Sequence, residues 1–484
     1  MEGLEISEIN LSEVKTASYS QRLDSNYFQK EFLQDENLFK QWESLQYIAD
    51  IKSGTTPKER DENLKNGIIL LKTNDIRNNI LQDKQHDYFY IDEKTNNSMK
   101  SSQLKESDIL INIVGATTDV IGRVSFVPKY FPKSNITQAM SFIRVSNSSY
   151  NAETLFIFLQ SKYGNKQTRR IARPTGQYNI NNEELGSYKI PLFSLPFQSK
   201  IETMVKNAHR KLDNSKMLYT QAQNILISEL GLENFNPSNE KVSIKTLKES
   251  FFKTGRLDSE YYQPKYDEIL NKITKYGCSE FTNFVDSYTT GYPYSSDSYV
   301  EKDGIVLIKI SNINNFKLDI SSASLIPKND IDLSAENVVQ KNDILVSMSG
   351  TIGNSCIVQD DIKAVVNQRI MKIKSKNINP VVFSLIINSM IGKNQLERIQ
   401  TGGVQANISP KDILKIQIPC IKTSVQDEIA NYIKQSMEYS KKAKELLEIS
   451  TKSVEIAIDK DEQAAHNFLE QNRTEQNRTE QNRL

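Results

Sequence analysis

Cysteine, histidine and tryptophan are scarce in this chain of 484 residues, which has three cysteines, three histidines and one tryptophan. Cys278, Cys356 and Cys420 lie far apart, so they form neither a disulfide framework nor a zinc-ligand spacing with the scattered histidines. No apolar run approaches the roughly 20 residues that span a bilayer, and no signal peptide opens the sequence. We therefore expect a cytoplasmic protein that contacts no membrane.

An excess of charge of one sign is also absent. The chain has 61 Lys and Arg against 60 Asp and Glu, for a net charge of +1. A generally basic nucleic-acid coat is excluded, and any contact with DNA must come from local patches.

Sequence motifs for catalysis are missing as well. There is no Gly-rich phosphate loop, no Gly-rich cofactor fingerprint, no His-Glu-x-x-His and no Asn/Asp-Pro-Pro-aromatic motif of amino-methyltransferases. We expect a chain that recognises rather than catalyses, with no metal and no cofactor of its own.

What the sequence does contain is an internal repeat, in the same order along nearly the whole chain. Its offset drifts between 228 and 237 residues, as expected for two copies of one domain with insertions in loops. The clearest matches are Arg22-Leu23-Asp24-Ser25 with Arg256-Leu257-Asp258-Ser259, Gly67–Lys72 with Gly304–Lys309, Asp108-Ile109-Leu110 with Asp343-Ile344-Leu345, Asn179-Ile180 with Asn407-Ile408, and Pro191 and Gln198 with Pro419 and Gln426.

Each copy is predicted to contain short strands, because Ile- and Val-rich segments are bounded by Gly, Asn, Asp and Pro. A helical pattern follows in residues 151–171 and 381–399. The predicted strands are residues 68–72, 108–114, 122–127 and 140–145 in the first copy, and 305–310, 343–348, 354–358 and 370–373 in the second.

Each copy ends in a long helix with apolar and small residues at 4-3-4-3 spacing, a heptad seam. The first seam runs from Phe197 to Leu226, and the second, richer in Ser, runs from Val425 to Val454. Each helix could pack on its own domain alone, but the shared seam favours the two helices packing against each other. A helix of about 33 residues is about 50 Å long, more than the roughly 34–36 Å between DNA half-sites one turn apart.

These patterns predict an α+β fold of two homologous mixed α/β domains, with two long coiled-coil helices and a pseudo-two-fold repeat. The last segment repeats Glu-Gln-Asn-Arg-Thr and has no apolar face, so it is expected to be disordered or a fraying helix. The expected boundaries are residues 1–40 (N-terminal segment), 41–195 (first domain), 196–235 (central helix), 236–275 (connecting segment), 276–420 (second domain), 421–469 (C-terminal helix) and 470–484 (tail).

Several loops combine amide, small and basic residues that suit contacts with bases and phosphates. Residues 72–79 and 309–315 are such loops, and a basic stretch from Lys162 to Arg173 leads into Thr175-Gly176-Gln177-Tyr178-Asn179. Asn-rich loops are also ordinary turns, the basic stretch would equally suit a solvated helix face, and the Thr-Gly and Asn-Ile residues would equally shape a turn.

The recurring order Thr-Gly, Gln, Asn-Ile, Ile-Pro and Gln at the start of a long helix resembles the specificity subunit of type I restriction–modification systems. It occurs as Thr175-Gly176, Gln177, Asn179-Ile180, Ile190-Pro191 and Gln198, and again as Thr401-Gly402, Gln405, Asn407-Ile408, Ile418-Pro419 and Gln426.

The resemblance covers roughly residues 20–460, and it implies two domains that each read half of a split double-stranded DNA site. It also implies that the two target-recognition domains are separated by two long antiparallel coiled-coil helices. These helices dock modification subunits, which bind S-adenosylmethionine and methylate adenine. A restriction subunit joins the complex in host defence, and ATP and Mg²⁺ are expected on the partner subunits.

The loops of the two copies differ, so we expect an asymmetric bipartite site. A recognition subunit for a fused nuclease–methyltransferase partner and a scaffold that binds only protein remain alternatives. The candidate DNA-binding residues are Lys72, Asn74, Arg77, Lys162, Lys166, Arg169, Arg170, Arg173, Gln177 and Tyr178 in the first copy, and Tyr292, Tyr294, Lys309, Asn312, Lys393, Arg398 and Gln405 in the second.

Overall fold

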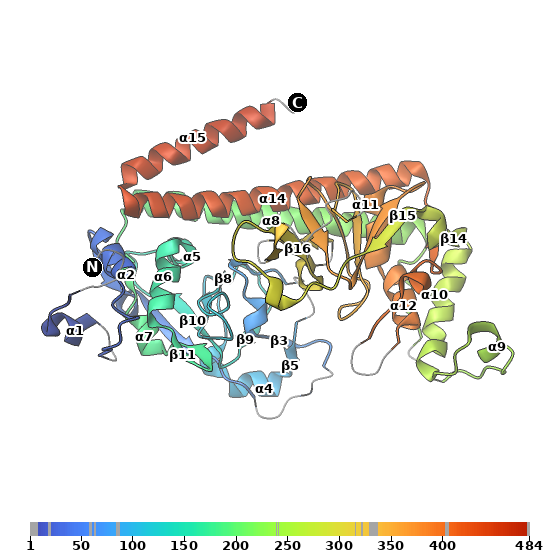
Figure 1. Cartoon of the computed structure of the whole chain (residues 1–484), viewed down its shortest axis with the longest axis horizontal. Helices are drawn as coiled ribbons and strands as arrows, with labels where there is room; N and C mark the ends of the chain where they lie inside the picture. Colours follow the sequence, from blue (N-terminus) through green and yellow to red (C-terminus); the bar gives the residue numbers. More distant parts are fainter. Residues whose placement is uncertain are drawn as a thin grey trace. The chain divides into compact units, whose positions relative to one another are not determined.

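The chain divides into two compact units, as the repeat predicts. Unit 1 comprises Met1–Asp213 and Tyr439–Leu484, and unit 2 comprises Asn214–Glu438 (Figure 1). No helix of the described part is long and apolar enough to cross a membrane. The computed structural model describes residues 8–17, 21–57, 61, 64–83, 88–238, 240, 242–314, 316–320, 323–328, 337–401 and 406–481.

Unit 1 is built around a sheet in the order β2-β10-β6-β8-β4, in which β10 pairs antiparallel with both β2 and β6. Its strands are β2 (Ala49–Ser53), β10 (Met140–Val145), β6 (Ile109–Asn112), β8 (Val124–Phe126) and β4 (Asn79–Ile80). Smaller sheets are β5 (Tyr90–Ile91), β3 (Ile68–Leu71) and β9 (Ser134–Ile136); β11 (Arg173–Thr175), β12 (Gln177–Asn179) and β7 (Val114–Gly115); and β1 (Trp42–Ser44) with β13 (Lys189–Pro191).

Unit 2 repeats this plan with the sheet β15-β23-β20-β21, where β23 takes the place of β10. Its strands are β15 (Val285–Thr290), β23 (Ile370–Ser375), β20 (Ile344–Ser347) and β21 (Ser355–Ile357). Smaller sheets are β19 (Ser324–Ile326), β16 (Ile305–Ile308) and β22 (Ala364–Val366); β17 (Ile313–Asn314) with β18 (Lys317–Leu318); and β14 (Cys278–Glu280) with β24 (Gln417–Pro419).

Short helices complete each unit. In unit 1 these are α1 (Leu11–Ala17), α2 (Lys30–Leu38), α3 (Leu45–Ile48), η1 (Thr73–Asp75), α4 (Glu93–Ser98), η2 (Lys100–Ser102), α5 (Ala152–Gln160), α6 (Lys162–Ile171) and α7 (Asn182–Gly186). In unit 2 they are α9 (Phe251–Thr254), η3 (Ser259–Tyr262), α10 (Pro264–Thr274), η4 (Phe281–Phe284), η5 (Ser296–Ser298), η6 (Ile310–Asn312), α11 (Pro380–Asn388), α12 (Met390–Ile399) and α13 (Pro410–Ile413).

The predicted strands are confirmed, but each single helical segment is a pair of helices. Ser161 separates α5 from α6, and Ser389 separates α11 from α12; both have extended backbones. Each serine accepts a hydrogen bond from the first turn of the following helix, which caps it. Each break is a single capping serine with no Gly or Pro beside it, so the sequence pattern did not reveal it.

The long helices are α8 (Leu195–Glu229) and α14 (Thr423–Asp459), and they pair antiparallel within each unit. In unit 1, Lys211 Nζ lies 5.6 Å from the centre of the Tyr439 ring, and Ala208 and Ala443 belong to one core. In unit 2, the buried Ser436 Oγ donates to the carbonyl of Ser215 at 2.7 Å. The prediction that the two seams pack against each other is confirmed.

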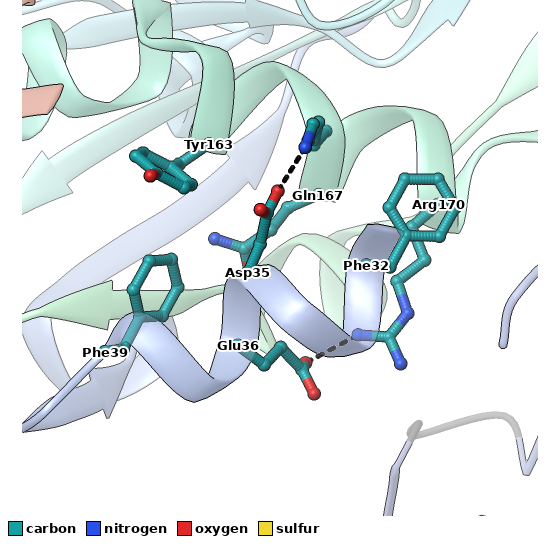
Figure 2. A pocket seen from close by; sticks show the side chains of 8 residues that line it. Phe32, Asp35, Glu36, Phe39, Tyr163, Gln167 and Arg170 are labelled. Atoms are coloured by element: carbon teal, nitrogen blue, oxygen red, sulfur yellow. Dashed lines mark hydrogen bonds and ion pairs between the residues drawn. The ribbon is translucent and has the colours of Figure 1, made fainter. Parts of the chain in front are cut away.

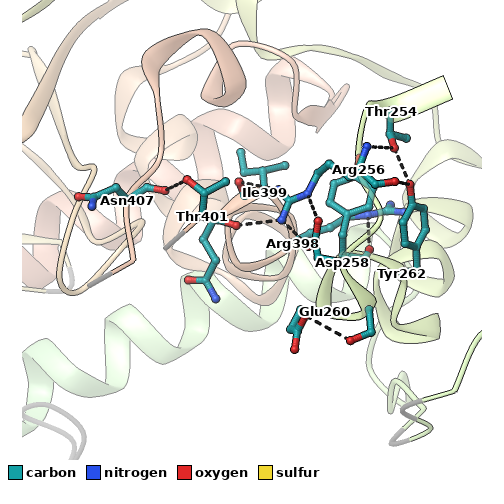
Figure 3. Close-up of polar contacts among 12 residues, drawn as sticks. Thr254, Arg256, Asp258, Glu260, Tyr262, Arg398, Ile399, Thr401 and Asn407 are labelled. Carbon is teal, nitrogen blue, oxygen red and sulfur yellow. Dashed lines mark hydrogen bonds and ion pairs between the residues drawn. The ribbon is translucent and has the colours of Figure 1, made fainter. Parts of the chain in front are cut away.

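The repeated Arg-Leu-Asp-Ser motif closes the end of a helix in both units. Arg256 donates to the carbonyls of Ile399 and Gln400, each at 3.2 Å, where α12 ends (Figure 3). Arg22 likewise donates to Ile171 at the end of α6 at 2.9 Å. An arginine is favourable there because the last carbonyls of a helix lack partners within it.

The aspartate of the motif holds the arginine in place. Asp24 accepts from Arg22 at 2.6 Å, and Asp258 accepts from Arg256 at 2.8 Å. These hydrogen bonds lower the pKa of both carboxyl groups. The residues preserved between the copies in this motif therefore serve the scaffold.

Of the two alternatives expected for the tail, the structure has the helix: α15 (Glu462–Gln481) extends across most of the repeated pentapeptides. Its first turn is tied to unit 1, where Glu462 accepts from the backbone N–H of Ser194 at 2.7 Å and Ala465 is fully buried. Helix α14, which carries the second seam, ends at Asp459, whereas the sequence predicted that it continues to residue 469. Residues 482–484 lie outside the described residues.

The serine pair between α8 and α14 gives a test of the helix packing. Ser436 Oγ donates to the Ser215 main-chain carbonyl and also lies 3.1 Å from Ser215 Oγ, so the two side chains are coupled. Ser436→Ala alone removes both contacts, and we expect a loss of about 1 kcal/mol in the free energy of unfolding. Replacing both serines with Ala should cost less than the sum of the single changes. The corresponding positions in unit 1 are Ala208 and Ala443, which are fully buried. Chemical denaturation of the four proteins of the double-mutant cycle measures this coupling; strictly additive losses would contradict the pairing.

Candidate nucleic-acid interface

In unit 1, loops from separate parts of the chain meet at one edge of the central sheet. Strand β10 begins at this edge, whereas β2 and β6 end there, because Ser141 pairs with Ser53 and Met140 pairs with Asn112. We call this the loop edge of unit 1, and define it by residues 54–57, 72–78, 116–119, 137–139 and the hairpin of β11 and β12.

Polar contacts fix these loops on the sheet. The buried Asn112 donates to the carbonyl of Thr73 at 3.0 Å and to that of Val120 at 3.1 Å, so it holds two of the loops. The hairpin adds to the same edge, because Tyr178 in β12 pairs with Gly115 in β7. The exposed side chains of the loops are thus presented from a rigid base.

Unit 2 has the equivalent edge. Thr290 at the end of β15 and Ser347 at the end of β20 pair with the first residues of β23. Asn407 pairs with Ser349, which attaches the segment after α12. The loop edge of unit 2 is residues 291–294, 309–313, 349–353 and 367–369.

Many predicted binding residues lie at these two edges. Among them, Tyr292 has 65% of its surface exposed and stacks edge-on against Tyr294 at 5.2 Å. The exposed ones are Asn74, Arg77, Gln177 and Tyr292, and the half-buried ones are Lys72, Tyr178, Tyr294 and Lys309. Lys72 Nζ lies 3.9 Å from the Phe89 ring, and Lys309 Nζ donates to Ser324 at 2.7 Å.

Arg170 was predicted to contact DNA, and its burial corrects that prediction. Only 5% of it is exposed, and its guanidinium pairs with Glu36 of α2 at 2.5 Å and donates to the carbonyl of Tyr27 at 2.8 Å. Figure 2 shows the side chain directed at α2 across a small hollow. Arg170 is a scaffold residue.

The other cations of this stretch have mixed surroundings. Lys162 pairs with Asp459 at 2.9 Å, Lys166 pairs with Asp35 at 2.7 Å, and Arg173 pairs with Glu184. Arg169 is exposed and forms no ion pair with an acidic residue of the described part. Of the stretch, Arg169 is therefore the cation best placed to meet a phosphate.

Unit 2 requires corresponding corrections. Arg398 pairs with Asp267 at 2.9 Å and donates to the carbonyl of Tyr261, which reproduces the role of Arg170. Asn312 is 1% exposed and caps the turn of Lys309, as Asp75 caps that of Lys72 in unit 1. Neither Arg398 nor Asn312 is available as a base reader.

Two further predicted residues remain to be placed. Lys393 is exposed on α12, and Gln405 lies outside the described residues. The structure also adds Arg369, an exposed residue of the loop edge whose guanidinium donates to Ser349 at 3.3 Å. The sequence could have indicated Arg369 by its position in the turn between two buried strands, where the first copy has Ala139.

Within the described ranges, no cluster of three His, Cys, Asp or Glu residues could hold a metal ion.

Comparison with known proteins adds family information to this geometry. A family model described as "Type I restriction modification DNA specificity domain" matches residues 40–224 and again residues 274–449. No curated protein sequence matches the chain.

Among solved structures, the type I restriction–modification S subunit from M. genitalium has 13% identity and a TM-score of 0.36, with 88% of this chain and 95% of that chain covered. The HsdS subunit from Thermoanaerobacter tengcongensis has 12% identity and a TM-score of 0.28, with 87% and 97% covered.

The neighbours Arg169 and Arg170 form a matched pair for a test. Arg170→Ala removes the buried guanidinium that donates to Glu36 and to the Tyr27 carbonyl and leaves Glu36 paired with Lys189 alone, so it should cost about 1–3 kcal/mol in the free energy of unfolding. Arg169→Ala should change stability by less than about 0.5 kcal/mol and weaken binding to duplex DNA, with the salt dependence reduced by about one unit. Thermal unfolding and fluorescence anisotropy at several salt concentrations measure both. A destabilised Arg169→Ala protein, or a stable Arg170→Ala protein with weakened binding, would contradict the assignment.

Proposed function

The chain belongs to the family of type I restriction–modification DNA specificity domains, and on that basis we propose how it reads DNA: each unit contacts one half of a split site through its loop edge. The observation that carries the proposal is the same scaffold occurring twice with different loops on it. The sheets, the helix-closing arginines and the polar ties recur, whereas several exposed residues of the loop edges, such as Arg77 and Tyr292, differ from their counterparts in the other unit.

The differences between the edges support an asymmetric site. Gly54 is followed by Thr55 and Thr56, while its counterpart Gly291 is followed by Tyr292 and Pro293. In the other loop, the exposed Arg77 corresponds in sequence to Asn314. Arginine suits guanine and asparagine suits adenine in the major groove, so the two edges should read different sequences.

We propose that α8 and α14 set the gap between the two half-sites and dock the modification subunits. The 35 residues of α8 correspond to roughly 50 Å of helix, enough to reach between half-sites one or more DNA turns apart. A paired helix resists bending better than a single one, because each seam is buried against the other.

The chemistry is assigned to partner subunits. The modification subunits would bind S-adenosylmethionine and methylate adenine, and a restriction subunit would use ATP and Mg²⁺. This chain would then be a non-catalytic subunit that recognises double-stranded DNA. That role accords with the absence of methyltransferase and phosphate-loop motifs from its sequence.

Copurification and methylome sequencing test the proposal together. Separate modification and restriction chains should copurify with this chain, and a bipartite methylated motif should appear in the host only when its gene is present. One partner carrying both activities would favour the fused nuclease–methyltransferase alternative. The absence of any motif that depends on the gene would favour a protein-binding scaffold.

Exchange of one domain should change one half-site. Replacing residues 41–195 with the corresponding domain of another family member should alter one half of the methylated motif and leave the other half and the gap unchanged. The core of each unit is made of its own residues, so the exchange need not disturb unit 2. Methylome sequencing reads the result, and a change in both halves would contradict separate reading.

The length of the paired helices should set the gap. Inserting seven residues after Asp213 and seven after Glu438 keeps the heptad phase of both seams and adds about 10 Å of helix. We expect the gap in the methylated motif to grow by up to about three base pairs, at about 3.4 Å per base pair, with both half-sites unchanged. Insertion into α8 alone is the control that breaks the pairing. Altered half-sites with an unaltered gap would rule out the spacer role.

A further inference from the structure

One exposed glutamine recurs at the same place in both loop edges. Gln138 lies between β9 and β10, and Gln368 lies between β22 and β23; both are exposed. Neither belongs to the motifs by which the repeat is recognised in the sequence.

The backbone around each glutamine is fixed in the same way. The turn is closed by Met140 N–H donating to the Thr137 carbonyl at 3.1 Å, and by Ile370 N–H donating to Asn367 at 3.0 Å. A glycine of the neighbouring loop packs directly on this turn in both units. A Cβ on Gly54 would collide with the carbonyls of Ile136 and Thr137, and one on Gly291 would collide with that of Val366.

The side chains of these glutamines have no contact that would explain why they recur. Other glutamines that recur tie the scaffold together: Gln167 exchanges two hydrogen bonds with Lys189, and Gln395 does the same with Gln417. The backbone N–H of Gln138 donates to Thr56 Oγ1 at 3.5 Å and that of Gln368 to the Tyr292 carbonyl at 3.2 Å. The side-chain amides of both glutamines form no hydrogen bond with another residue of the described part, and their exposure leaves them open to a ligand.

The residues beside each glutamine differ between the units. Thr137 and Ala139 flank Gln138, whereas Asn367 and Arg369 flank Gln368. Different flanking residues are expected where the two edges read different sequences. An identical residue held on an identical turn, in otherwise different surroundings, is expected to meet a chemical feature that both half-sites share.

We propose that Gln138 and Gln368 each contact an adenine, one in each half of the DNA site. The glutamine amide matches the major-groove edge of adenine, since its oxygen accepts from the N6 amino group while its NH₂ donates to N7. Cationic side chains of the loop edges, such as those of Arg77 and Arg369, suit phosphates or guanine better than adenine. The inference rests on the proposed function, because it assumes that the two loop edges face DNA.

Single substitutions in the full chain, expressed with its partner subunits, test the proposal. Gln138→Ala should make one A·T position of one half-site degenerate in the methylome, and Gln368→Ala should do so only in the other half-site. Gln34→Ala, at an exposed glutamine of α2, is the control and should leave the motif unchanged. A motif unchanged by both loop substitutions, or degenerate in both halves after one of them, would overturn the proposal.

A modified base gives a second, chemical readout. In a duplex carrying the methylome-derived site, 7-deazaadenine at the identified position removes the N7 acceptor. It should weaken binding of the complex about 5-fold or more, and should have no further effect on the Gln138→Ala complex. Equal weakening of both complexes would overturn the contact. The bipartite motif of the unsubstituted protein tests the proposed function separately, so failure of one is distinguishable from failure of the other.

Discussion

A glutamine in the first turn of each long helix, buried in α8 and half-buried in α14, holds the β-rich part of each unit on that helix. Gln198 accepts from the backbone N–H of Asn151 at 2.9 Å and donates to the carbonyl of Phe193 at 2.9 Å. Gln426 accepts from Asn379 at 2.9 Å and donates to Ile421 at 2.8 Å. One side chain thereby links the start of α5 or α11 to the helix that follows the last strand. Leaving such buried groups without partners would cost about 1–3 kcal/mol each, so the orientation of each loop edge on its own helix is fixed.

The scaffold could be predicted well from the sequence because its signals are local. Ile- and Val-rich segments such as β6 and β20 are buried throughout, and the 4-3-4-3 spacing of α8 and α14 identified the paired seams. The interruptions at Ser161 and Ser389 were not predicted, because each break is a single capping serine with no Gly or Pro beside it. For the tail, the sequence left disorder and a helix as alternatives, because its pentapeptides have no apolar face and its attachment depends on Glu462 and Ala465, which precede them.

The binding residues could be predicted only in part, because a charge in the sequence does not reveal its partner. Arg170 and Arg398 lie in basic stretches that suit DNA, yet their partners, Glu36 and Asp267, lie more than 130 residues away in sequence and reach them only in the folded unit. Asn312 was also predicted to bind DNA, but it takes the capping position that Asp75 holds in unit 1. The residues that recur in both copies are mainly those that stabilise the shared scaffold. A polar residue that recurs is therefore more often one that forms hydrogen bonds within the unit than one that contacts a base.

The same reasoning explains how recognition can change without loss of stability. Each unit closes its own core. The core of unit 1 is drawn from residues 27–208 and 443–465, and that of unit 2 from residues 222–433. The side chains that vary, such as Arg77 and Tyr292, are exposed on loops whose backbones are held by buried residues such as Asn112. Exposed substitutions away from caps and ties usually change stability by less than about 0.5 kcal/mol. Substitutions in the loops can therefore change the DNA sequence that is recognised, while the hydrogen bonds of Gln198 and Gln426 keep the scaffold unchanged.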